Sequence, residues 1–308
     1  MEETVMKEKR FGQDNTCRWV IINTDKIELT ADTLADDTID NDIIAYAMDE
    51  NERAIVNYDA DDQALLVIFN ALDNHRTSEH YETIPVTFIV QPERLITIVS
   101  DKSEYLITHF NQYLMHHRQV SVNKFFFSCL TLITEQYFPI MDAIDKEKDI
   151  LNKKLRQTTT KHNLFALSDL ETGSVYLQVA ANQNVLLLEK LKNHHVIRRS
   201  NPADIEELDD ALIEAKQLAS MTQLNAQIFQ QLSGAYNNVL NNNLNENLTT
   251  LTIISIILAV FGVITGFFGM NIALPMMKTP HAWVYIVGLF VVLWGVIKVI
   301  LDYIVNRH

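Results

Sequence analysis

The side chains best suited to chemistry lie along one face of a single apolar segment near the C-terminal end of the sequence. At three- and four-residue steps this face is mostly small, hydroxyl-bearing or amide-bearing: Asn245, Leu248, Leu251, Thr252, Ser255, Ala259, Gly262 and Gly266. The bulky Ile253, Ile257, Phe261 and Phe268 fall largely elsewhere. Such a face is typical of close helix–helix packing, for which Gly262-x-x-x-Gly266 is suited, or of a pore wall formed by several copies. The spacing alone leaves both interpretations open.

The apolar segment ends in Gly269-Met270-Asn271. The amide oxygen of Asn271 can accept hydrogen bonds from water molecules around a cation, and Mg²⁺ gives up its water reluctantly. A ring of neutral carbonyl oxygens could therefore hold a hydrated ion weakly enough for conduction. Gly and Asn are also ordinary residues at a helix C-terminus, so the residues alone favour a filter and a helix cap equally.

Carboxylates are abundant before this segment, and oxygen ligands suit Mg²⁺. Five of them are candidate cation ligands: Asp36, Asp37, Asp49, Glu207 and Asp210. The alternative for each is a solvated acidic surface, and acids near position 207 would also complement the dipole of a helix that begins there. The sequence contains no metalloprotease, P-loop, nucleophile-elbow or dinucleotide motif, which argues against an enzyme and against ATP-driven transport.

The element that positions these groups is the run from Leu251 to Asn271. No charged residue occurs between Glu246 and Lys278. The residues from Leu251 to Phe268 would rise roughly 27 Å as a helix, close to the thickness of the hydrocarbon core of a bilayer. A second apolar run follows at Ala282–Ile297. We expect a transmembrane region at 248–308, with spans at about 249–269 and 282–302 and an outer loop at 272–281.

A long helix should lead into the first span. Ser200-Asn201-Pro202 is a helix-start signal, and no strong breaker follows before the membrane. We expect one helix from Ala203 to Gly269, roughly 100 Å long, with its cytosolic part at 203–247 as a stalk. Apolar residues repeat along the stalk at three- and four-residue steps, so it needs partner helices or other copies of the chain.

The first 202 residues are expected to form a cytosolic α/β domain. Strands are predicted at Cys17–Ile22, Ala54–Tyr58, Ala64–Phe69, Ile84–Val90 and Leu95–Val99. Helices are predicted at Asn41–Met48, Tyr105–His117, Ser121–His162, where Pro139 is a kink or a boundary, and Leu164–Arg199. Residues 1–15 are expected to be loose. The predicted fold class is an α+β membrane protein whose stalk helix runs into the first of two C-terminal transmembrane helices.

Charge and targeting signals indicate the partners and the location of the protein. The formal net charge is -14, and the acidity lies almost entirely before residue 248. It disfavours nucleic acid and anionic lipid as partners and suits a surface bathed in cations. The N-terminal residues lack the apolar core of a signal peptide, so we expect both termini in the cytoplasm of a protein that crosses the plasma membrane twice. The pairs His116-His117 and His194-His195 are interpreted as surface residues, because neighbours on a helix point about 100° apart.

A Gly-Met-Asn tripeptide that closes the first of two C-terminal membrane helices resembles the signature of the CorA family of magnesium transporters. Asn245-Glu246-Asn247-Leu248, Leu251-Thr252-Ile253-Ile254 and Gly266-Phe267-Phe268 are also similar to that family. The resemblance implies a homopentamer that lets Mg²⁺ flow passively into the cytosol and closes when cytosolic Mg²⁺ binds carboxylates. The five acids named above are therefore candidate regulatory ligands. The resemblance also implies a selectivity filter at Gly269, Met270 and Asn271, and an inner pore segment with an apolar constriction at Asn245, Leu248, Leu251 and Thr252.

Two departures from the family pattern keep alternatives open. Ala259-Val260 occupies the position where many members have Met-Pro, and the outer loop carries Lys278 and no carboxylate. One alternative is a transporter of the same fold for Co²⁺, Ni²⁺ or Zn²⁺, whose hydrated ions are similar in size to hydrated Mg²⁺. The other is a membrane-tethered scaffold or sensor that does not conduct.

Overall fold

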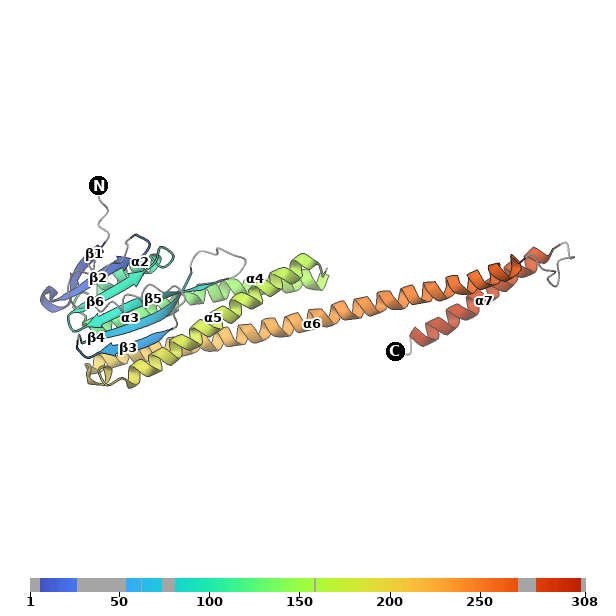
Figure 1. The fold of residues 1–308 in the computed structure, drawn as a ribbon. Coiled ribbons are helices and arrows are strands. Elements are labelled where there is room, and N and C mark those ends of the chain that lie inside the picture. The colour runs from blue at the N-terminus through green and yellow to red at the C-terminus, as the bar shows by residue number, and fades with distance from the viewer. Residues whose placement is uncertain are drawn as a thin grey trace. The chain divides into compact units, whose positions relative to one another are not determined.

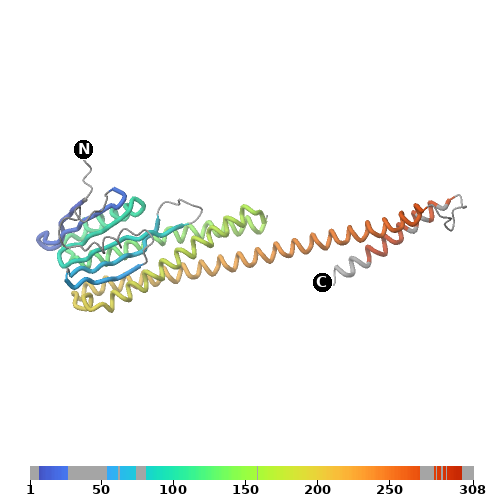
Figure 2. Tube along the Cα trace, viewed as in Figure 1, coloured from blue at the N-terminus to red at the C-terminus, as the bar shows by residue number. Residues whose placement is uncertain are grey.

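The computed structural model describes residues 6–26, 54–61, 63–73, 81–157, 159–270 and 281–305. The chain divides into two compact units, Met1–Gly234 and Ala235–His308, which are described separately here. Figures 1 and 2 trace both units along the chain. The expected helix at Asn41–Met48 lies outside the described residues.

The first unit contains a mixed sheet. Its strands among the described residues are β1 (Met6–Phe11), β2 (Cys17–Asn23), β3 (Ile55–Asp59), β4 (Ala64–Leu72), β5 (Thr83–Gln91) and β6 (Arg94–Val99). They lie in the order β1-β2-β6-β5-β4-β3, and the β2–β6 pair is parallel while the other pairs are antiparallel. Every residue of β4 and β6 is buried, as expected of runs rich in apolar and β-branched residues.

The five strands expected from the sequence are confirmed, but the expectation of a loose N-terminus is wrong. Residues Met6–Phe11 form β1, which pairs along its whole length with β2. Lys7, Lys9 and Arg10 are exposed, as suits the edge of a sheet. Phe11 is buried and meets the ring of Phe125 edge-on, with centroids 5.2 Å apart.

Helices cover the sheet in the first unit. They are α2 (Tyr105–His116), α3 (Val122–Glu135), α4 (Tyr137–Gln157), α5 (Lys161–Asn193), a short 3-10 turn η2 (Ile197–Arg199) and the beginning of α6. The centre of α3 packs on the sheet, because the Phe125 ring contacts Trp19 at 5.1 Å and the Phe126 ring contacts Phe88 at 5.4 Å. Figure 1 shows α4 and α5 extending past the sheet as a pair.

Two helix boundaries differ from expectation. The single helix expected from Ser121 to His162 is two helices, α3 and α4, which separate at Gln136 rather than at Pro139. Pro139 lies in the first turn of α4, where its missing N–H costs nothing. The helix expected to continue to Arg199 ends at Asn193, where His194 adopts an extended conformation with ψ 136°.

Helix α6 runs from Pro202 to Phe268, 67 residues, so the prediction of one helix from Ala203 to Gly269 is confirmed within one residue at each end. In the first unit it lies antiparallel to α5. Three interactions fix this register: Lys192 with Asp209 at 2.6 Å, Lys216 with Glu189 at 2.7 Å, and Ser233 with Glu171 at 2.5 Å. The predicted stripe is buried at Leu208, Leu212, Ala215 and Leu218.

The second unit contains the end of α6 and α7 (Ala282–Val305), which meet where the rings of Phe261 and Phe290 lie 5.2 Å apart. Among the described residues, α6 is the helix that is long and apolar enough to cross a membrane, and none of its apolar window is buried. Helix α7 contains a shorter apolar stretch, Trp283–Val299. Exposed side chains such as Val263 and Val299 are what a lipid environment accommodates.

Candidate ion pathway

Helix α6 has two distinct sides in the second unit. The half-buried side chains follow one stripe: Ile253, Ile257, Val260, Phe261 and Ile264. The ring contact of Phe261 with Phe290 shows that this stripe faces α7. At 3.6 residues per turn, Thr252 and Ala259 lie roughly 125–145° around the helix from the middle of the stripe. The sequence therefore placed Ile253, Ile257 and Phe261 correctly, away from the small and polar face.

The predicted pore residues are all exposed in the chain: Asn245, Leu248, Leu251, Thr252, Ser255, Ala259 and Gly262. A methyl group built on Gly262 or Gly266 would meet nothing within 4 Å. Helix α7 therefore does not use the Gly262-x-x-x-Gly266 pair for close packing. This face is available to another copy of the chain or to the interior of a pore.

The hydroxyl groups on this face are held in one orientation. Thr252 Oγ1 donates a hydrogen bond to the carbonyl of Leu248 at 2.7 Å, and Ser255 Oγ donates to the carbonyl of Leu251 at 2.8 Å. Because each O–H is directed back along the helix, each oxygen keeps lone pairs that can accept hydrogen bonds. The face therefore presents acceptors to whatever lies in front of it.

The end of α6 is tightly built around Gly269. Its N–H donates to the carbonyl of Thr265 at 2.9 Å, and a Cβ at this position would lie 3.1 Å from that same oxygen. A larger residue would fit only if the carbonyl of Thr265 moved by a few tenths of an ångström, so the close approach favours glycine there. Met270 follows and is exposed, while Asn271 lies outside the described residues.

The candidate regulatory carboxylates differ in their surroundings. Glu207 accepts a hydrogen bond from Ser128 Oγ at 2.7 Å and lies 3.6 Å from Lys124 Nζ. Asp210, one turn further along α6, is exposed, whereas Asp36, Asp37 and Asp49 lie outside the described residues. No three His, Cys, Asp or Glu side chains come together as a metal site within the described ranges. A cation sensor built from these ranges alone would need ligands from a second copy.

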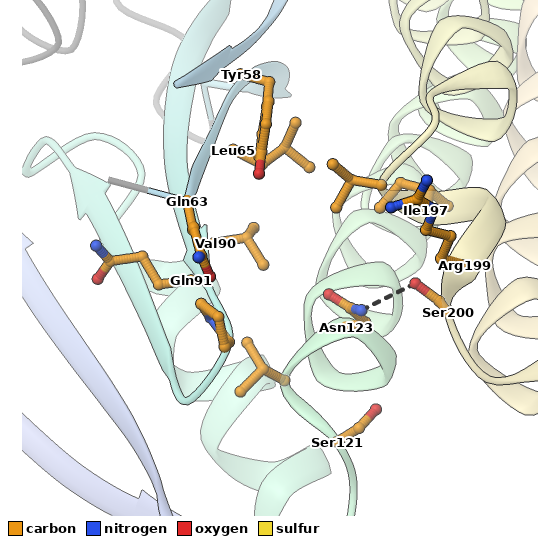
Figure 3. Close-up of a pocket in the computed structure, with 13 residues that line it drawn as sticks. Tyr58, Gln63, Leu65, Val90, Gln91, Ser121, Asn123, Ile197, Arg199 and Ser200 are labelled. Atoms are coloured by element: carbon orange, nitrogen blue, oxygen red, sulfur yellow. Dashed lines mark hydrogen bonds between the residues drawn. The ribbon is translucent and has the colours of Figure 1, made fainter. Parts of the chain in front are cut away.

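A cavity of about 320 Å³ lies between the sheet and the turn that leads into α6 (Figure 3). Tyr58, Leu65 and Val90 line it on the sheet side, and Asn123 and Ser200 line it on the helix side. Asn123 Nδ2 donates to Ser200 Oγ at 3.1 Å. No carboxylate belongs to its lining, so its chemistry does not suit a divalent cation.

The pair His194-His195 lies beside this cavity and not on a helix, so the assumption that the two rings diverge as helix neighbours is wrong. The rings lie 4.6 Å apart, and both contact Tyr58 at about the same distance, 5.5 Å and 5.4 Å. Burial, then the nearby His195 and Lys190, lowers the pKa of His194. The two rings therefore help to join β3 to the turn before α6.

A long apolar helix that is not buried and an exposed polar face are the features expected of an integral membrane protein that transports ions. The model of the family described as CorA-like Mg2+ transporter protein matches residues 14–302, so the chain belongs to that family. The family consists of transporters of Mg²⁺ and related divalent cations and not of enzymes, as the sequence indicated. Its fold class is the one that we expected: an N-terminal α/β domain, a long helix and C-terminal apolar helices.

Individual proteins are also similar to this chain in sequence or in fold. The chain is 25% identical over 252 residues to the cobalt/magnesium transport protein CorA of Methanocaldococcus jannaschii, covering 79% of this chain and 77% of that protein. The complete structure of the CorA magnesium transporter from the same organism matches with a TM-score of 0.79 at 21% identity, over 100% of this chain and 99% of that one. The full-length CmaX structure matches with a TM-score of 0.69 at 14% identity, over 94% and 88%.

Proposed function

We propose that copies of this chain surround a common axis, as a homopentamer, and let Mg²⁺ flow down its electrochemical gradient into the cytosol. One observation carries the proposal: the small and polar face of α6 is exposed and lies away from the side that contacts α7. A face that is neither packed within the chain nor apolar enough for contact with lipid is best suited to line a water-filled axis. Each of its residues then becomes a ring.

The rings divide the pathway into parts. Gly269, Met270 and Asn271 form the filter at the outer mouth, where amide oxygens hold the water shell of Mg²⁺ without removing it. Ser255, Ala259 and Gly262 line the wider middle part. At the inner end Leu248 and Leu251 form a constriction between Asn245 and Thr252, and such a constriction can close by expelling water.

The fixed hydroxyls of Thr252 and Ser255 favour a hydrated cation over an anion. Water molecules around a cation point their hydrogens outward, toward acceptors, whereas water around an anion points its oxygens outward, toward donors. Both hydroxyls have directed their donors to carbonyls of their own helix. A ring of such oxygens is therefore complementary to the second hydration shell of Mg²⁺.

Regulation follows from linkage. Carboxylates between neighbouring copies bind cytosolic Mg²⁺ in the closed state and stabilise that state, so uptake stops when Mg²⁺ is plentiful. Asp210 is exposed and therefore accessible for this role, and Asp36, Asp37 and Asp49 are candidates by residue type. Glu207 would first have to leave Ser128 and Lys124. The protein crosses the plasma membrane twice, with both termini in the cytoplasm.

The test is Mg²⁺ flux into proteoliposomes that contain the purified protein and a trapped Mg²⁺ dye. We expect Asn271→Ala to reduce the flux by about tenfold or more, equivalent to ~1.4 kcal/mol. Thr252→Val should also reduce it, because it removes an acceptor ring. Thr250→Val is the matched control: its hydroxyl bonds the carbonyl of Glu246 at 2.9 Å in the same way. Thr250 lies roughly 160° from Thr252 around the helix.

Three outcomes would change the proposal. Equal loss with Thr250→Val and Thr252→Val would show that the hydroxyls act on the helix and not on a pore. Passage of Co²⁺, Ni²⁺ or Zn²⁺ without Mg²⁺ would replace the ion and keep the pathway. No flux of any divalent cation through a well-folded oligomer would favour a scaffold or sensor.

A further inference from the structure

The hairpin of α4 and α5 carries a basic stretch, although the chain as a whole is acidic. Between Asp149 and Asp169 the sequence has no acidic residue, although the formal net charge of the chain is -14. The same stretch contains four cations, Lys153, Lys154, Arg156 and Lys161, all of them exposed. None of the four forms an ion pair with a residue that the structure describes. The cations are therefore available to an external partner.

Two large apolar side chains stand exposed beside these cations. Phe165 is 68% exposed and Ile150 is 55% exposed. Both line an open groove of about 610 Å³ between α4 and α5, together with Lys154, while Glu147 and Asp169 also belong to the lining. Phe165, Ile150 and the four cations are called the basic tip below. Exposed aromatic and aliphatic groups set among Lys and Arg are typical of a surface that meets the interface of a membrane.

The basic tip lies at one particular end of the first unit. Along the antiparallel pair α5–α6, the contacts run from Lys192–Asp209 through Glu189–Lys216 to Glu171–Ser233. The beginning of α5, and the basic tip with it, therefore lies at the end where α6 leaves this unit. The apolar segment of α6 begins at Leu251, eighteen residues after Ser233 in the same helix. The tip is thus on the side of the unit from which the chain continues to the membrane.

We propose that the basic tip docks on anionic lipid headgroups of the membrane in which the chain is embedded. Lys153, Lys154, Arg156 and Lys161 attract the negative surface, and Phe165 and Ile150 enter the interface. The overall acidity of the chain does not prevent this, because salt screens charges beyond about 8 Å at physiological ionic strength. An acidic surface of a second copy would satisfy the cations but would leave Phe165 and Ile150 without an apolar environment.

The proposal rests on the chain being embedded in a membrane and not on ion conduction, so the two can fail separately. The test is hydrogen exchange of peptides covering 150–168 in the full-length protein, in nanodiscs of phosphatidylcholine alone and in discs with about one third phosphatidylglycerol. We expect exchange at the ends of α4 and α5 to be about fivefold slower in the anionic discs. Salt near 1 M should largely abolish the difference, since it shortens the screening length to about 3 Å.

Matched variants separate the tip from general charge. Lys153→Gln/Lys154→Gln should reduce the lipid-dependent difference to below about twofold. Lys7→Gln/Arg10→Gln removes two exposed cations from β1 and should leave the difference unchanged. Phe165→Ser should weaken it, whereas Met115→Ser, at a position that is 69% exposed on α2, should not.

Three results would overturn the proposal. The first is equal exchange in the two kinds of disc. The second is an equal effect of the Lys7/Arg10 control. The third is protection of the tip in both lipids and in detergent, which would mean that it docks on a second copy of the chain.

Discussion

Replacing Asn184 by Ala would measure what one helix side chain contributes to the edge of the sheet. Strand β3 pairs with β4 only as far as Ile68, so no residue of a described strand lies opposite Asn70 of β4 on that side. There Asn184 of α5 forms hydrogen bonds with the backbone of Asn70. Its Oδ1 accepts from the N–H of Asn70 at 3.0 Å, and its Nδ2 donates to the carbonyl of Asn70 at 2.8 Å. Tyr137 Oη also donates to that carbonyl, at 2.9 Å.

The magnitude follows from which groups lose their partners. In Asn184→Ala the carbonyl of Asn70 keeps Tyr137, but the buried N–H of Asn70 loses its acceptor, at a cost of about 1–3 kcal/mol. The space left by the amide adds about 1 kcal/mol. We expect the first unit to lose about 3 kcal/mol, which corresponds to a fall in melting temperature of roughly 6–12 °C for a unit of this size.

The assay is thermal unfolding of the full-length protein in detergent, followed by circular dichroism at one scan rate for all variants. Asn182→Ala is the control, because Asn182 lies on the same helix and is exposed. It should melt at the wild-type temperature or slightly above, since Ala is the better helix former. If the two variants melt within about 2 °C of each other, the two hydrogen bonds of Asn184 do not stabilise the sheet and the reasoning is wrong.

Three further predictions concern the first unit. Gly12 has φ 83°, and a Cβ there would lie 2.8 Å from Cys17 Sγ, so Gly12→Ala should destabilise by about 2 kcal/mol in a chemical unfolding experiment. Gly234→Ala, in a helix with open space around it, should instead stabilise by about 0.5–1 kcal/mol, and a shift of both variants in the same direction would contradict this argument. Burial, with a smaller effect of Asp73, raises the pKa of Tyr105, whose hydroxyl donates to the carbonyl of Leu72 at 2.9 Å. Because the folded pKa exceeds the unfolded one, the contribution of the neutral phenol is complete below about pH 10 and is lost as the pH rises toward the folded pKa. Melting temperatures from about pH 8 to 11 should therefore fall less steeply in Tyr105→Phe than in wild type, and parallel curves would argue against the shift.

Local sequence signals predicted the elements whose pattern is strong. Helix α6 was predictable because apolar residues repeat along it at helical steps and no proline occurs between Pro202 and Pro275. Gly234 costs only about 1 kcal/mol, too little to end a long packed helix. Strand β1 was not predictable, because its sequence MKEKRF has four consecutive charged residues and lacks the alternation of apolar and polar residues that marks a strand. The strand forms because its backbone pairs with β2, and its side-chain pattern does not predict that pairing.

The residues of the candidate pathway could be predicted as one face of a helix, but the sequence of one chain does not show whether that face lines a pore. The spacing of Thr252, Ser255 and Ala259 identifies one side of a helix, whereas the neighbour that would make it a ring is another molecule. The candidate regulatory carboxylates were harder to predict from the sequence. What distinguishes Glu207 from Asp210 is Ser128, which is 79 residues away and comes near only when α3 packs on α6. No local sequence pattern predicts such a contact, so the sequence does not show which of these acids is free to bind a cation.

The parallel pairing of β2 with β6 determines when the sheet can form during synthesis. Cys17–Asn23 must wait for Arg94–Val99, so the sheet closes only after about a third of the chain has been made. The apolar segment at Leu251 lies 152 residues beyond Val99. At roughly 5–20 residues per second, translation needs about 8–30 s to reach it. Domains of this kind fold in milliseconds to seconds. The sheet can therefore be complete before the apolar segment has been synthesised.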